Sequence, residues 1–184
     1  MNWHITVNLG NLLLSLSDAM DLADPALIQH QQRTAFASWK IAETARLPVE
    51  RLEKLFTAAL LHDIGALSVE EKISLRNFKI KRIERHCIIG EILLDRVKLF
   101  EGVAKIVGCH HEPWRECKRP IESFPVLESQ FLSLSDHLER LVDRETFILH
   151  QRDDIVSKIR ALAGSQFHPD VVDAFLATSS REEF

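Results

Sequence analysis

Apolar residues recur at intervals of three and four along most of this chain, the spacing that places them on one face of an α-helix. The clearest stripe consists of Leu127, Phe131, Leu134, Leu138 and Leu141. Alternating runs of β-branched residues and Asn-Gly hairpin turns, which indicate strands, are nearly absent. The pattern therefore predicts an all-α protein, a bundle of about eight helices.

Prolines, glycines and capping residues set the expected helix boundaries. Asp24 before Pro25 is typical of an N-cap and a first helical residue, and Ser68 with Glu71 has capping-box spacing for a short helix. The other expected helices cover roughly residues 5–22, 25–46, 48–61, 78–97, 100–109, 127–141, 147–163 and 169–178. No Pro-, Gly- or Ser-rich linker interrupts the chain, so we expect one domain over 1–184, with an N-terminal helix in 1–23 and the core of the bundle in 24–178.

Composition narrows the range of partners. The net charge of −4 argues against a broad nucleic-acid surface. The longest apolar runs are far shorter than the roughly 20 residues of a membrane span, and the N-terminus lacks a basic leader and a small-residue cleavage site. The three cysteines form an odd set without CxxC spacing, which favours reduced thiols. We therefore expect a cytoplasmic protein with neither a nucleic-acid polymer nor a membrane as partner.

Candidate chemistry first appears in the stretch "TAALLHDIGALS", where His62 and Asp63 stand at the end of an apolar helix. A buried carboxylate without a partner costs several kcal/mol or becomes neutral, so the pair either lies in a surface turn or binds a cation. Other candidate ligands fall on separate predicted helices or helix ends, as a metal site in a bundle core requires. They are His30, His86, His110, His111 and Asp136. Taken singly, each has an ordinary explanation as a solvated or hydrogen-bonded residue.

Together these segments resemble the HD superfamily of metal-dependent phosphohydrolases, and most of all its HD-GYP branch. "LLHDIG" is similar to the naming signature, and "HQQRTA" resembles the first ligand helix. "ERHCIIGEILL" resembles the H-x-x-x-G helix, "VGCHHEPW" the paired-histidine segment and "LSLSDHLERL" the Asp helix. "AGSQFHPDVVDAF" resembles the closing helix of the branch. The six segments follow the family's order from about His30 to Phe175, so the expected fold is the HD-domain helical bundle.

The resemblance implies a pair of divalent metal ions in the core of the bundle, roughly 3.5–4 Å apart. By resemblance, the first ion is held by His30, His62, Asp63 and Asp136. The second is held by His86, His110 and His111, with Asp63 as the bridge and the residue central to catalysis. A mixed imidazole and carboxylate shell suits iron or manganese, with zinc, nickel or cobalt as alternatives.

Three departures from the HD-GYP pattern affect the part that would face a substrate. The loop "HHEPWRECKRPIES" contains no Gly-Tyr-Pro, and the chain has no tyrosine. Ala66 stands where a lysine usually follows His-Asp-Ile-Gly, and "ERLVDRETF" replaces the usual D-A-L-T…R-P-Y. Some HD-GYP proteins hold a third ion through a Glu one turn before the first ligand histidine. We expect none here, because Ala26 stands at that position and Asp24 is out of phase with His30.

Three functions remain open at this point. The resemblance implies a phosphodiesterase that cleaves cyclic di-GMP, a bacterial signalling dinucleotide, with Arg115, Lys118 and Arg119 contacting phosphate or guanine. The same centre could act on another nucleotide or phosphoester. Alternatively, the chain is a metal-binding signalling module of weak or no turnover that binds a nucleotide or a protein, and the basic loop is only solvated. The resemblance also allows a sensor or receiver module as partner, and the apolar first helix could serve a homodimer.

Overall fold

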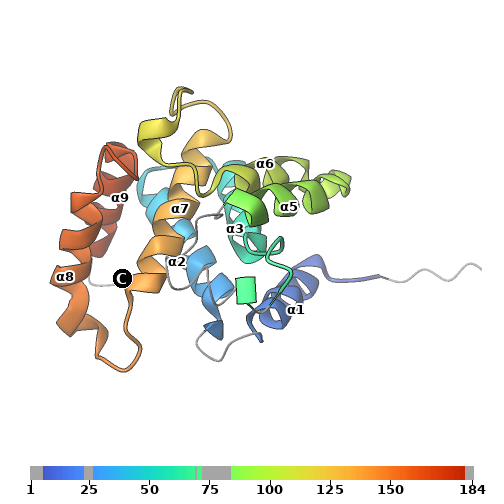
Figure 1. The fold of residues 1–184 in the computed structure, drawn as a ribbon, viewed down its shortest axis with the longest axis horizontal. Coiled ribbons are helices and arrows are strands. Elements are labelled where there is room, and N and C mark those ends of the chain that lie inside the picture. The colour runs from blue at the N-terminus through green and yellow to red at the C-terminus, as the bar shows by residue number, and fades with distance from the viewer. Residues whose placement is uncertain (1–5, 23–26, 69, 72–83, 181–184) are drawn as a thin grey trace, which may run out of the picture.

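The computed structural model describes residues 6–22, 27–68, 70–71 and 84–180, and most of them are helical (Figure 1). Their eight α-helices are α1 (Leu9–Asp21), α2 (His30–Thr44), α3 (Val49–Leu61), α5 (Glu84–Asp95), α6 (Glu101–Cys109), α7 (Val126–Leu141), α8 (Ile148–Ala161) and α9 (Pro169–Ser179). Two short 3₁₀ helices, η2 (Lys98–Phe100) and η3 (Trp114–Glu116), lie in the connections. These residues contain no strand, only one isolated bridge between Ala163 and Phe167. The all-α prediction is confirmed.

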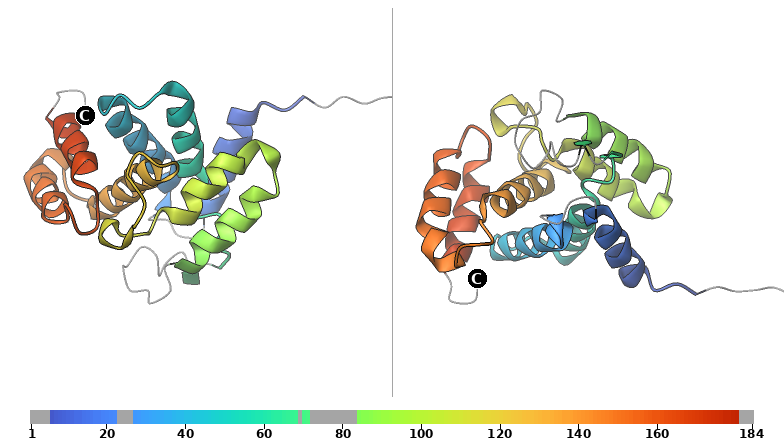
Figure 2. Two further views of the ribbon diagram at one scale, coloured as in Figure 1. Left: turned by 90° about the horizontal axis from the view of Figure 1, so that it is seen from above. Right: turned by 60° about the horizontal axis from the view of Figure 1, so that its bottom comes forward.

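Helix α2 lies at the centre of the bundle and packs against α3, α7 and α9. Its buried face is made of small and aliphatic residues such as Ala35, Ile41 and Ala42, so neighbouring helices approach closely. Helix α7 adds Phe131 and Leu134 from its apolar stripe, both fully buried. The α8–α9 pair lies at one end of the molecule and the α5–α6 pair at the other, as both views of Figure 2 show.

The packing brings together helix ends that are far apart in the sequence. Helix α6 contacts α3, α5 and α7, and α1 folds against α2 and α3. The end of α3, the end of α6, the first turn of α2 and the middle of α7 therefore face one region of the core. This region contains the histidines considered below.

Two expected helix starts are wrong. The first helix begins at Leu9 and not at residue 5, and the side chain of Asn8 caps it by accepting a hydrogen bond from the Asn11 amide at 3.0 Å. The second begins at His30 and not at Pro25, because Gln29 has a left-handed φ of 61° that no helix continues through. Asp24, Pro25 and residues 78–83 lie outside the described residues.

The capping-box prediction at Ser68 is confirmed for the hydrogen bond that lies within the described residues. Ser68 Oγ accepts a hydrogen bond from the Glu71 amide at 3.1 Å. The rest of that short helix lies outside the described residues. Among the helices that the structure describes, none combines the length and apolar character needed to cross a bilayer.

Candidate metal centre

Two helices end in a histidine that the same local hydrogen bond holds in place. His62 follows α3, and its Nδ1 donates to the Ala59 carbonyl at 2.8 Å. His110 follows α6, and its Nδ1 donates to the Val107 carbonyl at 2.7 Å. The last carbonyls of a helix have no partner within it, so each ring satisfies one of them. Both rings are fully buried, and each keeps a lone pair on Nε2 for a cation.

The first group of donor atoms surrounds one point between α2, α3 and α7. His30 Nε2 lies 3.3 Å from Asp136 Oδ1 and 3.8 Å from Asp63 Oδ2. His62 Nε2 lies 3.5 Å from each of the same two oxygens. Donors about 2.1 Å from a single ion lie roughly 3.0–3.4 Å from one another. A small contraction would therefore place these four atoms around a cation.

Asp63 turns its other oxygen toward a second group of histidines. Asp63 Oδ1 lies 3.6 Å from His86 Nε2, and this nitrogen lies 3.4 Å from His110 Nε2. The His111 ring lies next to both, with its centroid 4.1 Å from that of His110 and 5.0 Å from that of His86. The two oxygens of one carboxylate thus face two different groups of imidazoles.

Several of these donors are buried polar atoms that lack a hydrogen bond. His62 Nε2, Asp63 Oδ1 and His111 Nε2 have no hydrogen-bond partner within the described part of the chain. Buried polar atoms without partners are rare and costly, so an additional bonding partner is expected. Metal coordination would satisfy all three, and the donor set fits divalent ions. The structure brings together all seven side chains that the sequence singled out, namely His30, His62, Asp63, His86, His110, His111 and Asp136.

Burial keeps the second group of histidines neutral. Burial, with His86 and His62 adding to it, lowers the pKa of His110 to about 3. Burial also lowers the pKa of His111 well below its usual value and the pKa of His86 to a smaller degree. Neutral imidazole is the form that binds a metal, so these donors need no deprotonation.

His30 differs because carboxylates surround it. Burial alone would lower its pKa, but hydrogen bonds to Asp136 and Glu139 outweigh burial and raise the pKa to about 10. Glu139 Oε2 lies 2.5 Å from Nδ1, the ring nitrogen that does not face Asp63. This contact orients the ring and increases the basicity of Nε2. The sequence analysis did not single out Glu139, although its position three residues after Asp136 places both on one face of α7.

Arg140 is a buried cation that the sequence analysis did not assign to the site. Its Nε donates to Asp136 Oδ1 at 2.9 Å, its Nη2 donates to Oδ2, and its side chain is 6% exposed. Burial would raise the pKa of Asp136, but Arg140, followed by His30 and His62, holds it well below its usual value. The spacing of four residues between Asp136 and Arg140 on α7 was the sequence feature that could have predicted this pairing.

Asp21, at the end of α1, is a further carboxylate beside the first group. It is buried, and its Oδ2 accepts a hydrogen bond from the Gln31 amide at 3.4 Å. Burial raises the pKa of Asp21 to about 6. The sequence argument against a third ion considered only Ala26 and Asp24, both outside the described residues. That argument was incomplete, because α1 folds back against α2 and brings in Asp21.

The three basic residues proposed for substrate lie on the exposed loop around η3. Arg119 Nη2 donates to Glu112 Oε2 at 2.8 Å and to Cys109 Sγ at 3.4 Å. Arg115 Nε lies 3.4 Å from Glu116 Oε1. Two of these guanidiniums are therefore paired with carboxylates of their own loop, and substrate binding by Arg115, Lys118 and Arg119 stays a prediction.

A helical bundle with grouped histidines and aspartates in its core defines the class of protein. The HD domain model matches residues 27–141, and the chain belongs to this family. The match spans all of the candidate donors from His30 to Asp136. The HD superfamily resemblance seen in the sequence is thereby confirmed.

The relatives found by sequence are phosphodiesterases of cyclic dinucleotides. The chain is 24% identical to a 3'3'-cGAMP-specific phosphodiesterase of Vibrio cholerae over 99% of its own length and 44% of the relative's. It is 26% identical to a cyclic di-GMP phosphodiesterase of Thermotoga maritima over 80% of its own length and 43% of the relative's. The chain thus spans less than half the length of these relatives.

A solved structure shares the fold. It is a cyclic GMP-AMP-specific phosphodiesterase of Vibrio cholerae, with a TM-score of 0.74 at 20% identity over 95% of this chain and 49% of that one. The likeness supports the all-α architecture over nearly the whole chain.

Proposed function

We propose that this chain is a metal-dependent phosphodiesterase that hydrolyses a cyclic dinucleotide at a centre of two divalent ions. The observation that carries the proposal is the position of Asp63, whose Oδ2 lies 3.5 Å from His62 Nε2 while its Oδ1 lies 3.6 Å from His86 Nε2. A carboxylate divided in this way between two histidine groups is suited to bridge two ions. The names of the relatives support the choice of substrate class.

The donor atoms divide between two ions as follows. His30, His62, Asp63 and Asp136 would hold the first ion, and His86, His110 and His111, with Asp63 shared, would hold the second. The mixture of imidazole and carboxylate favours iron or manganese. When bound, such a pair supplies an activated water for attack on phosphorus and neutralises charge on the phosphate oxygens.

The chain itself contributes fixed geometry and a fixed positive charge. The hydrogen bonds from His62 to Ala59 and from His110 to Val107 lock the donor nitrogens in position. Ala66, where relatives of the HD-GYP branch carry a lysine, is only 3% exposed. Arg140, which donates to both oxygens of Asp136, offers a permanent cation instead and can attract a phosphate oxygen.

The substrate is best assigned as cyclic di-GMP or 3'3'-cGAMP, the two substrates that the relatives' names give. The loop after His111 has no Gly-Tyr-Pro, and Arg119 within it is paired with Glu112. Both features support slow turnover, because the loop offers few unpaired groups to a guanine. They also favour the second candidate function, a metal-binding module with little or no catalysis.

One experiment separates these functions. Metal content per chain is measured first, followed by turnover of cyclic di-GMP, 3'3'-cGAMP, a linear dinucleotide and a generic phosphodiester with manganese. The Asp63→Ala variant should lose both ions and all turnover, whereas Asp153→Ala, which removes an exposed carboxylate, should retain both. Stoichiometric metal without turnover of any substrate would favour the binding module. Full metal occupancy in Asp63→Ala would refute the bridging role.

A further inference from the structure

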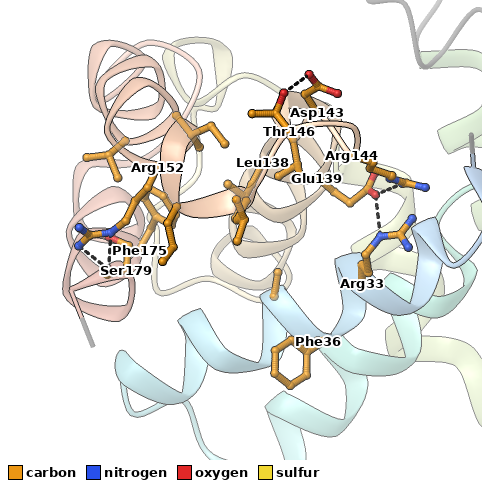
Figure 3. A pocket seen from close by; sticks show the side chains of 16 residues that line it. Arg33, Phe36, Leu138, Glu139, Asp143, Arg144, Thr146, Arg152, Phe175 and Ser179 are labelled. Atoms are coloured by element: carbon orange, nitrogen blue, oxygen red, sulfur yellow. Dashed lines mark hydrogen bonds and ion pairs between the residues drawn. The ribbon is translucent and has the colours of Figure 1, made fainter. Parts of the chain in front are cut away.

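A cavity lies between α2, α7, α8 and α9, and none of the seven candidate metal ligands lines it (Figure 3). Its volume is about 570 Å³, within the range of roughly 300–1,000 Å³ that small-molecule sites occupy. Most of the wall is apolar and includes Leu138, Ile155, Val156 and Phe175. A cavity of this kind suits the apolar body of a ligand.

One end of the cavity carries two arginines that share a single carboxylate. Arg33 Nε donates to Glu139 Oε1 at 2.9 Å, and Arg144 Nη2 donates to the same oxygen. Both guanidiniums also donate to the Ile28 carbonyl, at 2.5 Å from Arg33 and 3.3 Å from Arg144. Figure 3 shows both side chains converging on Glu139. His30 Nδ1 contacts the other oxygen of Glu139, so this one carboxylate has three side-chain partners.

The third arginine of the cavity wall, Arg152, has a different hydrogen-bond partner. Its Nε and Nη2 donate to the Ser179 carbonyl at 3.1 and 2.7 Å, which satisfies an oxygen at the end of α9. In Figure 3 this pair lies at the opposite end of the cavity from Arg33 and Arg144. The carbonyl leaves the charge of Arg152 in place. Three arginines and two carboxylates, Glu139 and Asp143, line the cavity, so one positive charge remains for an incoming anion to neutralise. The Glu139 end offers two guanidiniums close together. The side chains of Arg33 and Arg144 are 38% and 36% exposed, so solvent-borne ligands can reach them.

We propose that this cavity binds an amphipathic anion. The apolar body lies along Leu138 and Phe175, and the carboxylate or phosphate head contacts Arg33 and Arg144. A guanidinium forms paired hydrogen bonds with either head group, so both chemistries fit. The two arginines repel a cationic amphiphile of similar size. A neutral amphiphile gives them no new charged partner, so both stay on the same oxygen of Glu139.

Binding at this cavity also affects the metal centre, a consequence that rests on the proposed function. An anion that draws Arg33 and Arg144 toward itself leaves more negative charge on Glu139. Glu139 then accepts more strongly from His30 Nδ1 and holds the ring more firmly with Nε2 toward Asp63 and Asp136. Since coupling between two binding sites is reciprocal, metal and anion should each tighten the other by the same factor.

The binding step is tested in the metal-free chain, so that it does not depend on the proposed function. Decanoate is titrated by calorimetry beside decyltrimethylammonium and decanol. We expect one decanoate per chain, bound at least about tenfold more tightly than either control. Arg144→Gln should weaken decanoate binding by a similar factor, and Leu149→Asp should do the same by placing a carboxylate at the exposed rim. Arg160→Gln removes an exposed charge from the same helix as Leu149 without touching the cavity, and it should bind like the original chain.

Three results would overturn the assignment. Equal binding of all three amphiphiles would show that the arginines select nothing. Unchanged binding in Arg144→Gln would place the head group elsewhere. Absence of decanoate binding together with a dimer that Leu149→Asp dissociates would show that a second copy covers the cavity.

The link to the metal is tested by repeating the decanoate titration with manganese present. Several-fold tighter decanoate binding is expected, together with its loss in Glu139→Gln. An unchanged affinity would refute the link while leaving the anion site intact. If the chain binds no manganese at all, the proposed metal centre fails and the anion site is judged by the metal-free titration alone.

Discussion

Gly65 gives the sharpest test of how the two donor groups are held together. It follows Asp63 by two residues and lies against α5, which carries His86. A Cβ atom at this position would lie 2.0 Å from the His86 carbonyl oxygen and 2.6 Å from the Gly90 amide nitrogen. Both are backbone atoms, so no side-chain rotation can relieve the contact. The Gly65→Ala variant must instead move α5 away from the turn after α3.

The size of the movement follows from these distances. Ordinary contact begins at 3.4 Å, so the Cβ to oxygen distance must grow by 1.4 Å, from 2.0 to 3.4 Å. His86 moves with its own carbonyl, and its 3.6 Å separation from Asp63 Oδ1 increases. Overpacking of side chains costs about 1–3 kcal/mol, and we expect the upper end because backbone must shift. For a chain of this size, about 3 kcal/mol lowers the melting temperature by roughly 6–12 °C.

The measurement pairs melting temperature with metal content per chain. Gly65→Ala should melt lower and lose the ion of the His86 group while keeping that of the His30 group. Gly102→Ala is the matched control, because the atoms nearest to a Cβ there belong to the flexible Lys54 side chain, at 3.3 Å, and the Phe124 ring, at 3.5 Å. In an α-helix this change should be neutral or stabilise by up to about 1 kcal/mol. A Gly65→Ala variant with both ions and the melting temperature of Gly102→Ala would refute the reasoning.

Three further predictions concern charge and turnover. Burial raises the pKa of Asp21 from 3.8 to about 6, so its charged form costs the metal-free fold up to about 3 kcal/mol. This cost is absent below the lower pKa and complete above the higher one. Asp21→Asn should therefore stabilise the chelated protein at about pH 8 and not at about pH 4 in urea unfolding. Because the pKa of His30 is raised to about 10, manganese binding at neutral pH should release a proton and tighten as pH rises, which calorimetry in two buffers of different ionisation enthalpy measures. Cyclic di-GMP turnover, measured with the same metal, should be slower than that of a relative with an intact Gly-Tyr-Pro loop, and equal rates would show that the loop matters little.

The sequence was most informative about features that the local order of residues determines. Helix periodicity predicted the all-α class, and the His-Asp pair at the end of an apolar helix marked the centre before any packing was known. The hydrogen bonds of His62 and His110 also follow from local rules, since each ring reaches a carbonyl three residues back at a helix end. Helix starts were harder to predict. Gln29 has a left-handed backbone conformation, which glycine or asparagine would indicate in a sequence but glutamine does not.

Contacts between helices could not be derived in the same way. Asp21 reaches the first donor group only because α1 folds back against α2 and α3, and no spacing within α2 contains that information. The position of Glu139 on the same face of α7 as Asp136 could be predicted from their spacing. Its contact with His30 could not, because His30 lies on another helix. The shared carboxylate that ties Arg33 and Arg144 to His30 is likewise visible only in three dimensions.

Arg140 changes the electrostatics of the centre enough to predict its metal stoichiometry at low concentration. Asp63 and Asp136 supply two negative charges, the histidines supply none once His30 has released its proton, and Arg140 already cancels one of the two. The first divalent ion therefore makes the centre net positive, and the second binds against that charge until an anionic substrate joins it. We expect manganese to bind in two well-separated steps. Arg140→Leu should draw the steps together, and in chelator it should lose up to about 3–5 kcal/mol of stability, because Asp136 loses its strongest partner and keeps only His30 and His62. Saturating manganese should restore most of that loss. Equal destabilisation with and without metal, or unchanged spacing of the two steps, would show that Arg140 acts only through packing.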